Sequence, residues 1–186
     1  MSGQTIDRRS FLRDSGTLLL AFTVGGRVSW LSAAEARAAG VPLRQLTAAE
    51  AALVERLGEA LLPGSAAAGL AHYLDAQLAA PPAESLLILR YLGSSPPYLG
   101  FYRVGLAGAA RALGALAAEV AEPAAQAERL VEQMGQGDPP GWQGVPAPLF
   151  RYVLRADAID VVYGTPAGFA RLGLDYAAHI APPEGW

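Results

Sequence analysis

Residues 46–63 read LTAAEAALVERLGEALLP, and this stretch decides the fold class. Thr47 and Glu50 have the spacing of a capping box, in which the threonine hydroxyl and the glutamate carboxylate each accept a hydrogen bond from a backbone amide at a helix start. Leucine then recurs every fourth residue, at Leu53, Leu57 and Leu61. This spacing predicts an amphipathic helix with an apolar stripe on one side, which ends at Pro63.

Proline and glycine divide the sequence that follows into further helical segments. The expected helices cover residues 67–79, an apolar run at 85–93, and residues 98–120, 123–135 and 149–163. The chain is 52% hydrophobic, and alanine and leucine dominate over valine, isoleucine and threonine, which favours helices over strands. We therefore predict an all-α protein, a compact single-domain helical bundle that covers residues 39–186.

Two segments carry specific expectations about the core. The run SLLILRYLG at 85–93 is apolar on almost every side, so we expect it to lie centrally in the bundle. The helix at 149–163 should bury a combination of Phe150, Val153, Leu154, Ile159 and Val162. The four glycines within 98–120 lower helix propensity by up to ~1 kcal/mol each relative to alanine. Such glycines also permit close helix packing.

The stretch 135–148 reads GQGDPPGWQGVPAP and is expected to form an irregular loop. Structureless loops of this length are uncommon in compact domains and often bind or order another segment. Trp142 is its expected anchor. The anchor either contacts a partner or fixes the loop to its own domain.

Composition excludes several kinds of site. The formal net charge is -3 without a basic cluster after the N-terminal segment, so nucleic-acid binding is not expected. The absence of cysteine excludes iron–sulfur ligation, CxxCH haem attachment and disulfides. Of the two histidines, His72 shares a helix face with Asp75 as metal ligands can, but this pattern is more typical of a hydrogen-bonded structural pair. We expect no catalytic, cofactor-binding or metal-binding residue in this chain, because its carboxylates lie scattered on expected solvent faces.

Residues 1–38 resemble a twin-arginine export signal, the targeting sequence of proteins that cross the inner membrane in a folded state. The residues that fit the pattern are Arg8, Arg9, Phe11, Leu12 and Arg13. The apolar stretch at 17–26, TLLLAFTVGG, is shorter than the ~20 residues of a membrane-spanning helix. Ala36 and Ala38 form the small-x-small pattern that a signal peptidase reads, so we expect cleavage after Ala38.

The C-terminal part resembles a known family. DVVYGTP at 160–166, GFARLG at 168–173, Tyr176 and HIAPPEGW at 179–186 are similar to the C-terminal signature of the gluconate 2-dehydrogenase subunit 3 family. Residues 46–63 and 68–79 are similar to the opening helices of that family. The middle of the chain, about 84–132, agrees only in its helical character.

This resemblance implies a role in a three-part periplasmic enzyme. A large FAD-containing dehydrogenase subunit of the GMC type oxidises a sugar or polyol, and a cytochrome c subunit with haem c takes the electrons. The small subunit carries no redox cofactor, is not catalytic itself, and bears the signal that the twin-arginine translocation machinery reads. The implied location is the periplasm, with membrane association through the complex.

The end of the chain is expected to contact the flavin subunit. Stiff, proline-rich segments lose little conformational entropy on docking, and aromatic residues concentrate in interface cores. The expected interface residues are Trp142, Tyr163, Phe169, Tyr176, His179 and Trp186. Alternatively, the tail at 176–186 packs back on its own domain. Two other functions stay open at this point: a self-sufficient exported periplasmic binding protein, and a small enzyme with an unrecognised site.

Overall fold

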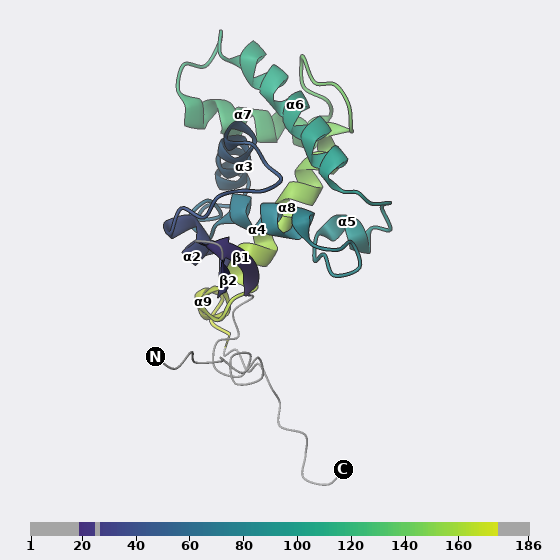
Figure 1. The fold of residues 1–186 in the computed structure, drawn as a ribbon. Coiled ribbons are helices and arrows are strands. Elements are labelled where there is room, and N and C mark those ends of the chain that lie inside the picture. The colour runs from purple at the N-terminus through teal and green to yellow at the C-terminus, as the bar shows by residue number, and fades with distance from the viewer. Residues whose placement is uncertain (1–18, 25–26, 175–186) are drawn as a thin grey trace, which may run out of the picture.

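The computed structural model describes residues 19–24 and 27–174, which form a helical body with one small hairpin (Figure 1). The hairpin pairs β1 (Leu20–Val24) antiparallel with β2 (Arg27–Leu31). The helices are α2 (Ala33–Ala38), α3 (Ala48–Leu61), α4 (Leu70–Ala79), α5 (Ile88–Tyr91), α6 (Leu99–Leu116), α7 (Pro123–Gln136), α8 (Ala147–Tyr163) and α9 (Pro166–Arg171). The predicted all-α class is confirmed, and the hairpin is an addition that the sequence did not predict.

Helix α8 lies at the centre of this arrangement. It contacts α3, α4, α5, α6, α7 and α9, and in Figure 1 it runs through the middle of the molecule. Its inward side carries the fully buried residues Phe150, Val153, Leu154 and Ala158. The other helices therefore share one core, which α8 connects.

Close packing between α6 and its neighbours depends on two glycines. A Cβ atom on Gly105 would overlap the ring of Phe150, and one on Gly108 would lie 3.0 Å from the indole of Trp142. The expectation that glycines permit close packing is thus confirmed at these two positions. At Gly114 a Cβ atom would meet nothing within 4 Å, so that glycine has no such role.

The predicted helix ends agree closely with the structure. The capping box at the start of α3 is present, since the amide of Glu50 donates to the Thr47 hydroxyl at 3.2 Å and the amide of Thr47 donates to the Glu50 carboxylate at 2.7 Å. Thr165 caps α9 in the same way, accepting from the amide of Gly168 at 3.0 Å, with Pro166 in the first turn. The irregular loop runs over 137–146, shorter than the predicted 135–148, because α7 and α8 each extend by about one half turn.

The prediction that the run at 85–93 lies centrally in the bundle is wrong for its second half. The run at 85–93 forms only the single turn α5, because Gly93 adopts a left-handed φ of +72° and the Ser94 amide bonds back to the Leu89 carbonyl at 3.0 Å. Its first half, including Leu87 and Leu89, is buried, but Tyr91 and Leu92 are exposed. The prediction that α8 buries a combination of its five apolar residues is confirmed, since Phe150, Val153, Leu154 and Val162 are buried. The fifth, Ile159, is exposed.

The hairpin and α2 pack onto the rest of the protein. Leu20 and Phe22 of β1 are buried against α4, and Ala36 of α2 is fully buried. A Cβ atom on Gly69, just before α4, would overlap the backbone carbonyl of Ala33. Part of the segment that resembles an export signal is therefore folded onto the domain.

The glycines of α6 give a direct test of the packing. Gly105→Ala should lower the free energy of unfolding by roughly 1–3 kcal/mol, because the added methyl group overlaps Phe150. Gly114→Ala, on the same helix, should raise it by up to ~1 kcal/mol, because only helix propensity changes. Urea denaturation followed by circular dichroism measures both. Equal effects in the two variants would contradict the close contact between α6 and α8.

Candidate functional site

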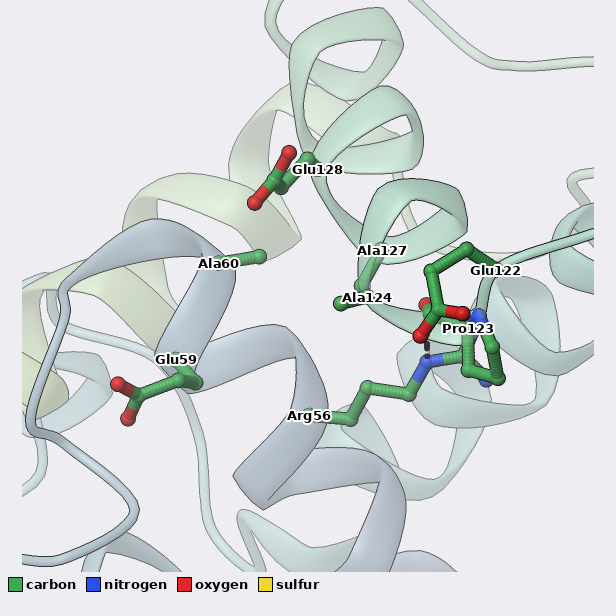
Figure 2. A pocket seen from close by; sticks show the side chains of 8 residues that line it. All are labelled: Arg56, Glu59, Ala60, Glu122, Pro123, Ala124, Ala127 and Glu128. Atoms are coloured by element: carbon green, nitrogen blue, oxygen red, sulfur yellow. Dashed lines mark hydrogen bonds between the residues drawn. The ribbon is translucent and has the colours of Figure 1, made fainter. Parts of the chain in front are cut away.

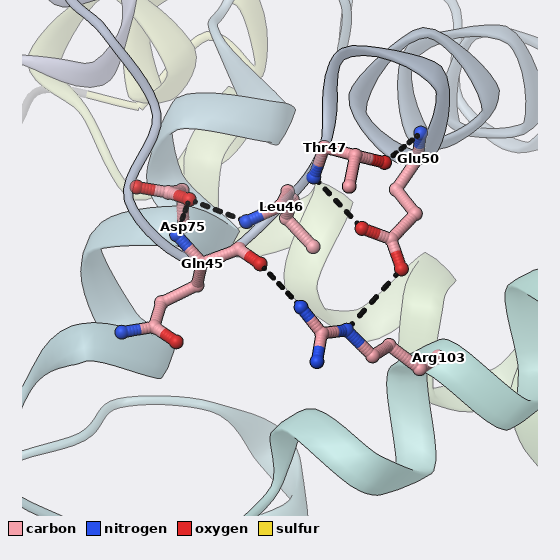
Figure 3. A network of polar contacts seen from close by, with 6 residues as sticks. All are labelled: Gln45, Leu46, Thr47, Glu50, Asp75 and Arg103. Atoms are coloured by element: carbon pink, nitrogen blue, oxygen red, sulfur yellow. Dashed lines mark hydrogen bonds and ion pairs between the residues drawn. The ribbon is translucent and has the colours of Figure 1, made fainter.

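The most highly connected polar side chain that we find is Asp75 of α4 (Figure 3). Its carboxylate accepts hydrogen bonds from three consecutive backbone amides, those of Arg44, Gln45 and Leu46, at 2.7–3.0 Å. Asp75 is almost completely buried. Charge-assisted bonds of this kind are strong, so Asp75 fixes the path of the chain into α3.

The same segment is held from a second side. Arg103 of α6 donates to the Gln45 carbonyl at 2.9 Å, and its Nε lies 3.3 Å from the Glu50 carboxylate. Figure 3 shows these contacts meeting at the start of α3. The network thus connects α3, α4 and α6. Its function is structural, because each of its bonds joins two parts of the chain.

His72 and Asp75 each bond to the segment that precedes α3. The Nε2 atom of His72 donates to the Val41 carbonyl at 3.1 Å, and the His72 ring lies 6.5 Å from the ring of Phe22. The Nδ1 atom is buried without a hydrogen-bond partner. Both residues therefore stabilise the segment before α3, which agrees with the structural role that the sequence favoured.

A second buried carboxylate, Asp157 of α8, was not predicted from the sequence. It is fully buried, accepts from the Tyr102 hydroxyl of α6, and accepts from the Ile88 amide at 3.1 Å. The Tyr73 hydroxyl nearby is buried without a partner. The expectation that the carboxylates lie on solvent faces is wrong here. The signal was present in the sequence, because position 157 continues the buried positions 150, 153 and 154 along the helix.

Burial dominates the electrostatics of Asp157. Desolvation raises the pKa of its carboxyl from 3.8 to about 7, and the bonds from Tyr102 and Ile88 oppose this shift only in part. Burial also raises the pKa of the Tyr102 hydroxyl, with the Asp157 carboxylate as the second cause. A carboxyl with such a pKa is suited to acid–base chemistry. Solvent does not reach Asp157, however, so we assign the pair to folding and not to catalysis.

A hollow of about 370 Å³ lies between α3 and α7 (Figure 2). The guanidinium of Arg56 projects into it and donates from Nε and Nη2 to the Pro123 carbonyl at 3.0 and 2.6 Å, and from Nη2 to Gln126 at 2.8 Å. The Glu59 carboxylate binds the amides of Gly64 and Ala66. Of the charged residues that line the hollow, Arg56 joins α3 to α7, Glu59 bonds to the turn after α3, and Glu122 and Glu128 also lie on its walls.

The predicted interface residues fall into two groups. Trp142 is only 7% exposed, contacts the ring of Phe150, and donates from Nε1 to the Val145 carbonyl at 2.7 Å. This geometry supports the alternative in which Trp142 fixes the loop to its own domain. Tyr163 and Phe169 are partly buried at the corner between α8 and α9. The remaining predicted residues, Tyr176, His179 and Trp186, lie outside the described residues.

Most of the predicted export signal, including Arg8, Arg9, Phe11, Leu12 and Arg13, also lies outside the described residues. The residues of the predicted cleavage pattern, in contrast, are among those that the structure describes. Ala36 and Ala38 belong to α2, whose start is fixed by a capping box between Ser32 and Glu35. Cleavage after Ala38 stays a prediction, and in this fold α2 must unwind before a peptidase can bind the site in extended form.

Within residues 19–24 and 27–174, three or more histidine or acidic side chains do not gather anywhere as a metal site would require. The same residues contain no helix that is long and apolar enough to cross a membrane. Comparison with known proteins finds no matching family, no matching curated protein and no matching solved structure. The resemblance to the gluconate 2-dehydrogenase subunit 3 family therefore stays a prediction.

Asp75→Asn tests the amide-binding role of Asp75. An asparagine amide offers one oxygen acceptor and brings an NH2 group against backbone donors, so we expect a loss of about 2–4 kcal/mol of unfolding free energy. The matched control is Asp138→Asn, because Asp138 accepts a single bond, from the Ala147 amide at 2.7 Å, which asparagine can keep. Chemical denaturation compares the two. If Asp138→Asn lowered the unfolding free energy as much as Asp75→Asn does, the three amide bonds of Asp75 would not explain its larger expected effect.

Asp157→Asn tests the raised pKa of the buried carboxyl. Because the folded-state pKa of about 7 exceeds the ordinary value of 3.8, Asp157 stabilises the fold most at low pH, and this contribution disappears as the pH rises from about 4 to 7. The full change is on the order of 4 kcal/mol. The unfolding free energy of the variant should therefore fall less between pH 5 and pH 8 than that of the unmodified protein. Asp138→Asn serves as the control, and parallel pH profiles for all three proteins would refute the shift.

Proposed function

We propose that this chain is the non-catalytic small subunit of an exported, FAD-dependent sugar or polyol dehydrogenase. In this role it carries the folded flavin subunit across the inner membrane and supports its maturation. The assembled enzyme passes electrons to a cytochrome c subunit. The flavin and the haem belong to the partner subunits, and this chain contributes the export signal and a binding surface.

The observation that carries the proposal is the combination of a twin-arginine pattern at residues 8–13 with a described body whose buried carboxylates, and the partly buried Arg56, bond to other parts of the chain. Asp75 binds backbone amides, Asp157 binds Tyr102 and Ile88, and Arg56 joins α3 to α7. The signal is one that folded proteins use. If the export signal of this chain serves a partner that already holds its cofactor, this chain needs no cofactor site of its own.

A self-sufficient periplasmic binding protein is less well supported. Ligand sites are concave and mostly apolar, with a few polar groups that converge on the ligand. In the hollow between α3 and α7, the guanidinium of Arg56 and the carboxylate of Glu59 are already hydrogen bonded to the chain. Arg56 and Glu59 cannot turn toward a ligand without breaking these hydrogen bonds.

The shared export signal gives the test. Arg8→Lys with Arg9→Lys should retain both this chain and the flavin subunit in the cytoplasm, because the partner crosses only while bound to this chain. Cell fractions are assayed for this chain by immunoblot and for flavin-dependent oxidation of gluconate, glucose and fructose with an artificial electron acceptor. Periplasmic activity should fall at least tenfold.

The matched control is Arg44→Lys with Arg129→Lys, which changes two exposed arginines outside the signal in the same conservative way. It should leave export of both proteins unchanged. Retention of this chain alone, with normal periplasmic flavin activity, would refute the shared signal.

A further inference from the structure

The hairpin and α2 form one continuous unit before the rest of the domain. Strand β2 ends at Leu31, Ser32 caps the following helix, and α2 begins at Ala33, so no loop separates the two elements. Both β1 and α2 contact α4, as Figure 1 shows. We name β1, β2 and α2 together the N-terminal strap. Because its elements follow one another directly, we expect the strap to move as one unit.

The strap is attached to the domain through one of its sides. The side chains that enter the core are those of Leu20, Phe22, Ala33 and Ala36. On the other side of the hairpin, Val28 is 68% and Trp30 59% exposed. An element that packs on one side loses fewer contacts on opening than a central helix such as α8, and such elements open locally while the rest of a domain stays folded.

A close backbone contact seats the strap on the domain at Gly69. A Cβ atom there would overlap the Ala33 carbonyl and would lie 2.8 Å from the Ala34 amide nitrogen. Gly69 also adopts a left-handed φ of +85°, which favours glycine. A residue outside the strap therefore determines how closely the strap can dock.

The predicted cleavage site lies at the end of this strap, in helical backbone. The bond to be cleaved joins Ala38 to Ala39, and the Ala39 amide donates to the Glu35 carbonyl at 2.9 Å. Ala36, which the small-x-small pattern presents to the peptidase, is fully buried. Proteases cut segments that have opened, so the docked strap withholds both the backbone and a recognised side chain.

The chain on both sides of this bond is tied to neighbouring helices. The Val41 amide donates to the Ala36 carbonyl at 3.0 Å, and the Val41 carbonyl accepts from Nε2 of His72 at 3.1 Å. Arg37 forms an ion pair with Glu55 of α3 at 2.8 Å. Opening the site therefore requires separation from α3 as well as from α4.

We propose that the N-terminal strap closes the predicted peptidase site while it is docked on α4, and that hydrolysis of the bond after Ala38 requires the hairpin and α2 to detach together. The burial of Leu20 and Phe22, far from the bond in sequence, then controls the rate of cleavage. The export signal stays joined to the domain until the strap is drawn off. This inference rests on the export step of the proposed function and needs no flavin subunit.

Two other routes to the bond differ from detachment of the strap in what they depend on. Fraying of α2 alone would depend on the capping box between Ser32 and Glu35, and not on Phe22 or Gly69. Unfolding of the whole domain would open the distant helix α7 as readily as α2. A protease that reports on both helices distinguishes these routes.

Glutamyl endopeptidase tests the purified full-length chain, because Glu35 is the first glutamate of the sequence and lies within α2. Initial cutting rates after Glu35, and after Glu132 of α7 as an internal reference, are measured by mass spectrometry. Gly69→Ala leaves the strap sequence unchanged, but its methyl group displaces the Ala33 carbonyl. It should raise the rate after Glu35 at least tenfold and change the rate after Glu132 less than twofold.

The matched control is Gly64→Ala. Gly64 lies in the same connection between α3 and α4 and has a similar left-handed φ of +91°. A Cβ atom there would lie 3.8 Å from the Arg171 guanidinium, clear of the described residues of the strap. The backbone strain is thus similar, and the rate after Glu35 should stay within twofold. If Gly69→Ala does not fold, Phe22→Ala replaces it, with the exposed Trp30→Ala as its control.

Equal rates after Glu35 in a variant and its control would overturn the strap. A parallel rise after Glu132 would also overturn it, because the domain would then be opening as a whole.

Processing in exporting cells is followed by pulse-chase labelling. Gly69→Ala should lose residues 1–38 at least threefold faster than Gly64→Ala. An equal rate in the two variants, or no cleavage after Ala38 in either, would overturn the role of the strap in processing. The flavin subunit enters neither assay, so failure of the strap leaves the proposed function standing, and failure of the shared export signal leaves the strap standing.

Discussion

The fold depends on the close contact between α6 and α8, where the ring of Phe150 occupies the space that a side chain at position 105 would need. Because α8 contacts six other helices, its distance from α6 determines where those helices can lie. A core packed at crystal-like density transmits such a constraint to all its neighbours. The glycine therefore costs some helix propensity in α6, and the burial of Phe150, Trp142 and Tyr102 compensates for that loss.

Two buried carboxylates join the helices around this contact, but in different ways. Asp75 meets three backbone amides and fixes an irregular segment, so its desolvation is balanced by charge-assisted bonds. Asp157 meets one hydroxyl and one amide, too few for two carboxylate oxygens, which explains why burial raises its pKa. Packing fixes the helices in place, and these two side chains fix the connections between them.

Local signals predicted much of this structure. The capping box at Thr47, the proline start of α7 and the Thr165 cap all depend on neighbouring residues, so the sequence alone was sufficient to find them. The errors concern tertiary context. Helical spacing places position 157 on the buried side of α8, but nothing local indicates that Tyr102 of a distant helix would bond to it, or that β1 and β2 would pair. The pattern of Tyr91 and Ile159 also predicts a core, because exposed and buried apolar residues look alike in sequence.

Under the proposed function, the N-terminal segment has two uses that compete for the same side chains. Leu20 and Phe22 belong to the predicted apolar part of the export signal, yet in the folded chain they are buried against α4. Export machinery and the domain cannot bind these side chains at once. Releasing them exposes apolar surface at a cost of roughly 1.5–3 kcal/mol for each side chain. Under the proposed function, the export machinery must therefore bind this segment strongly enough to offset the free energy lost when the hairpin detaches. A less stable hairpin would make the segment accessible more often.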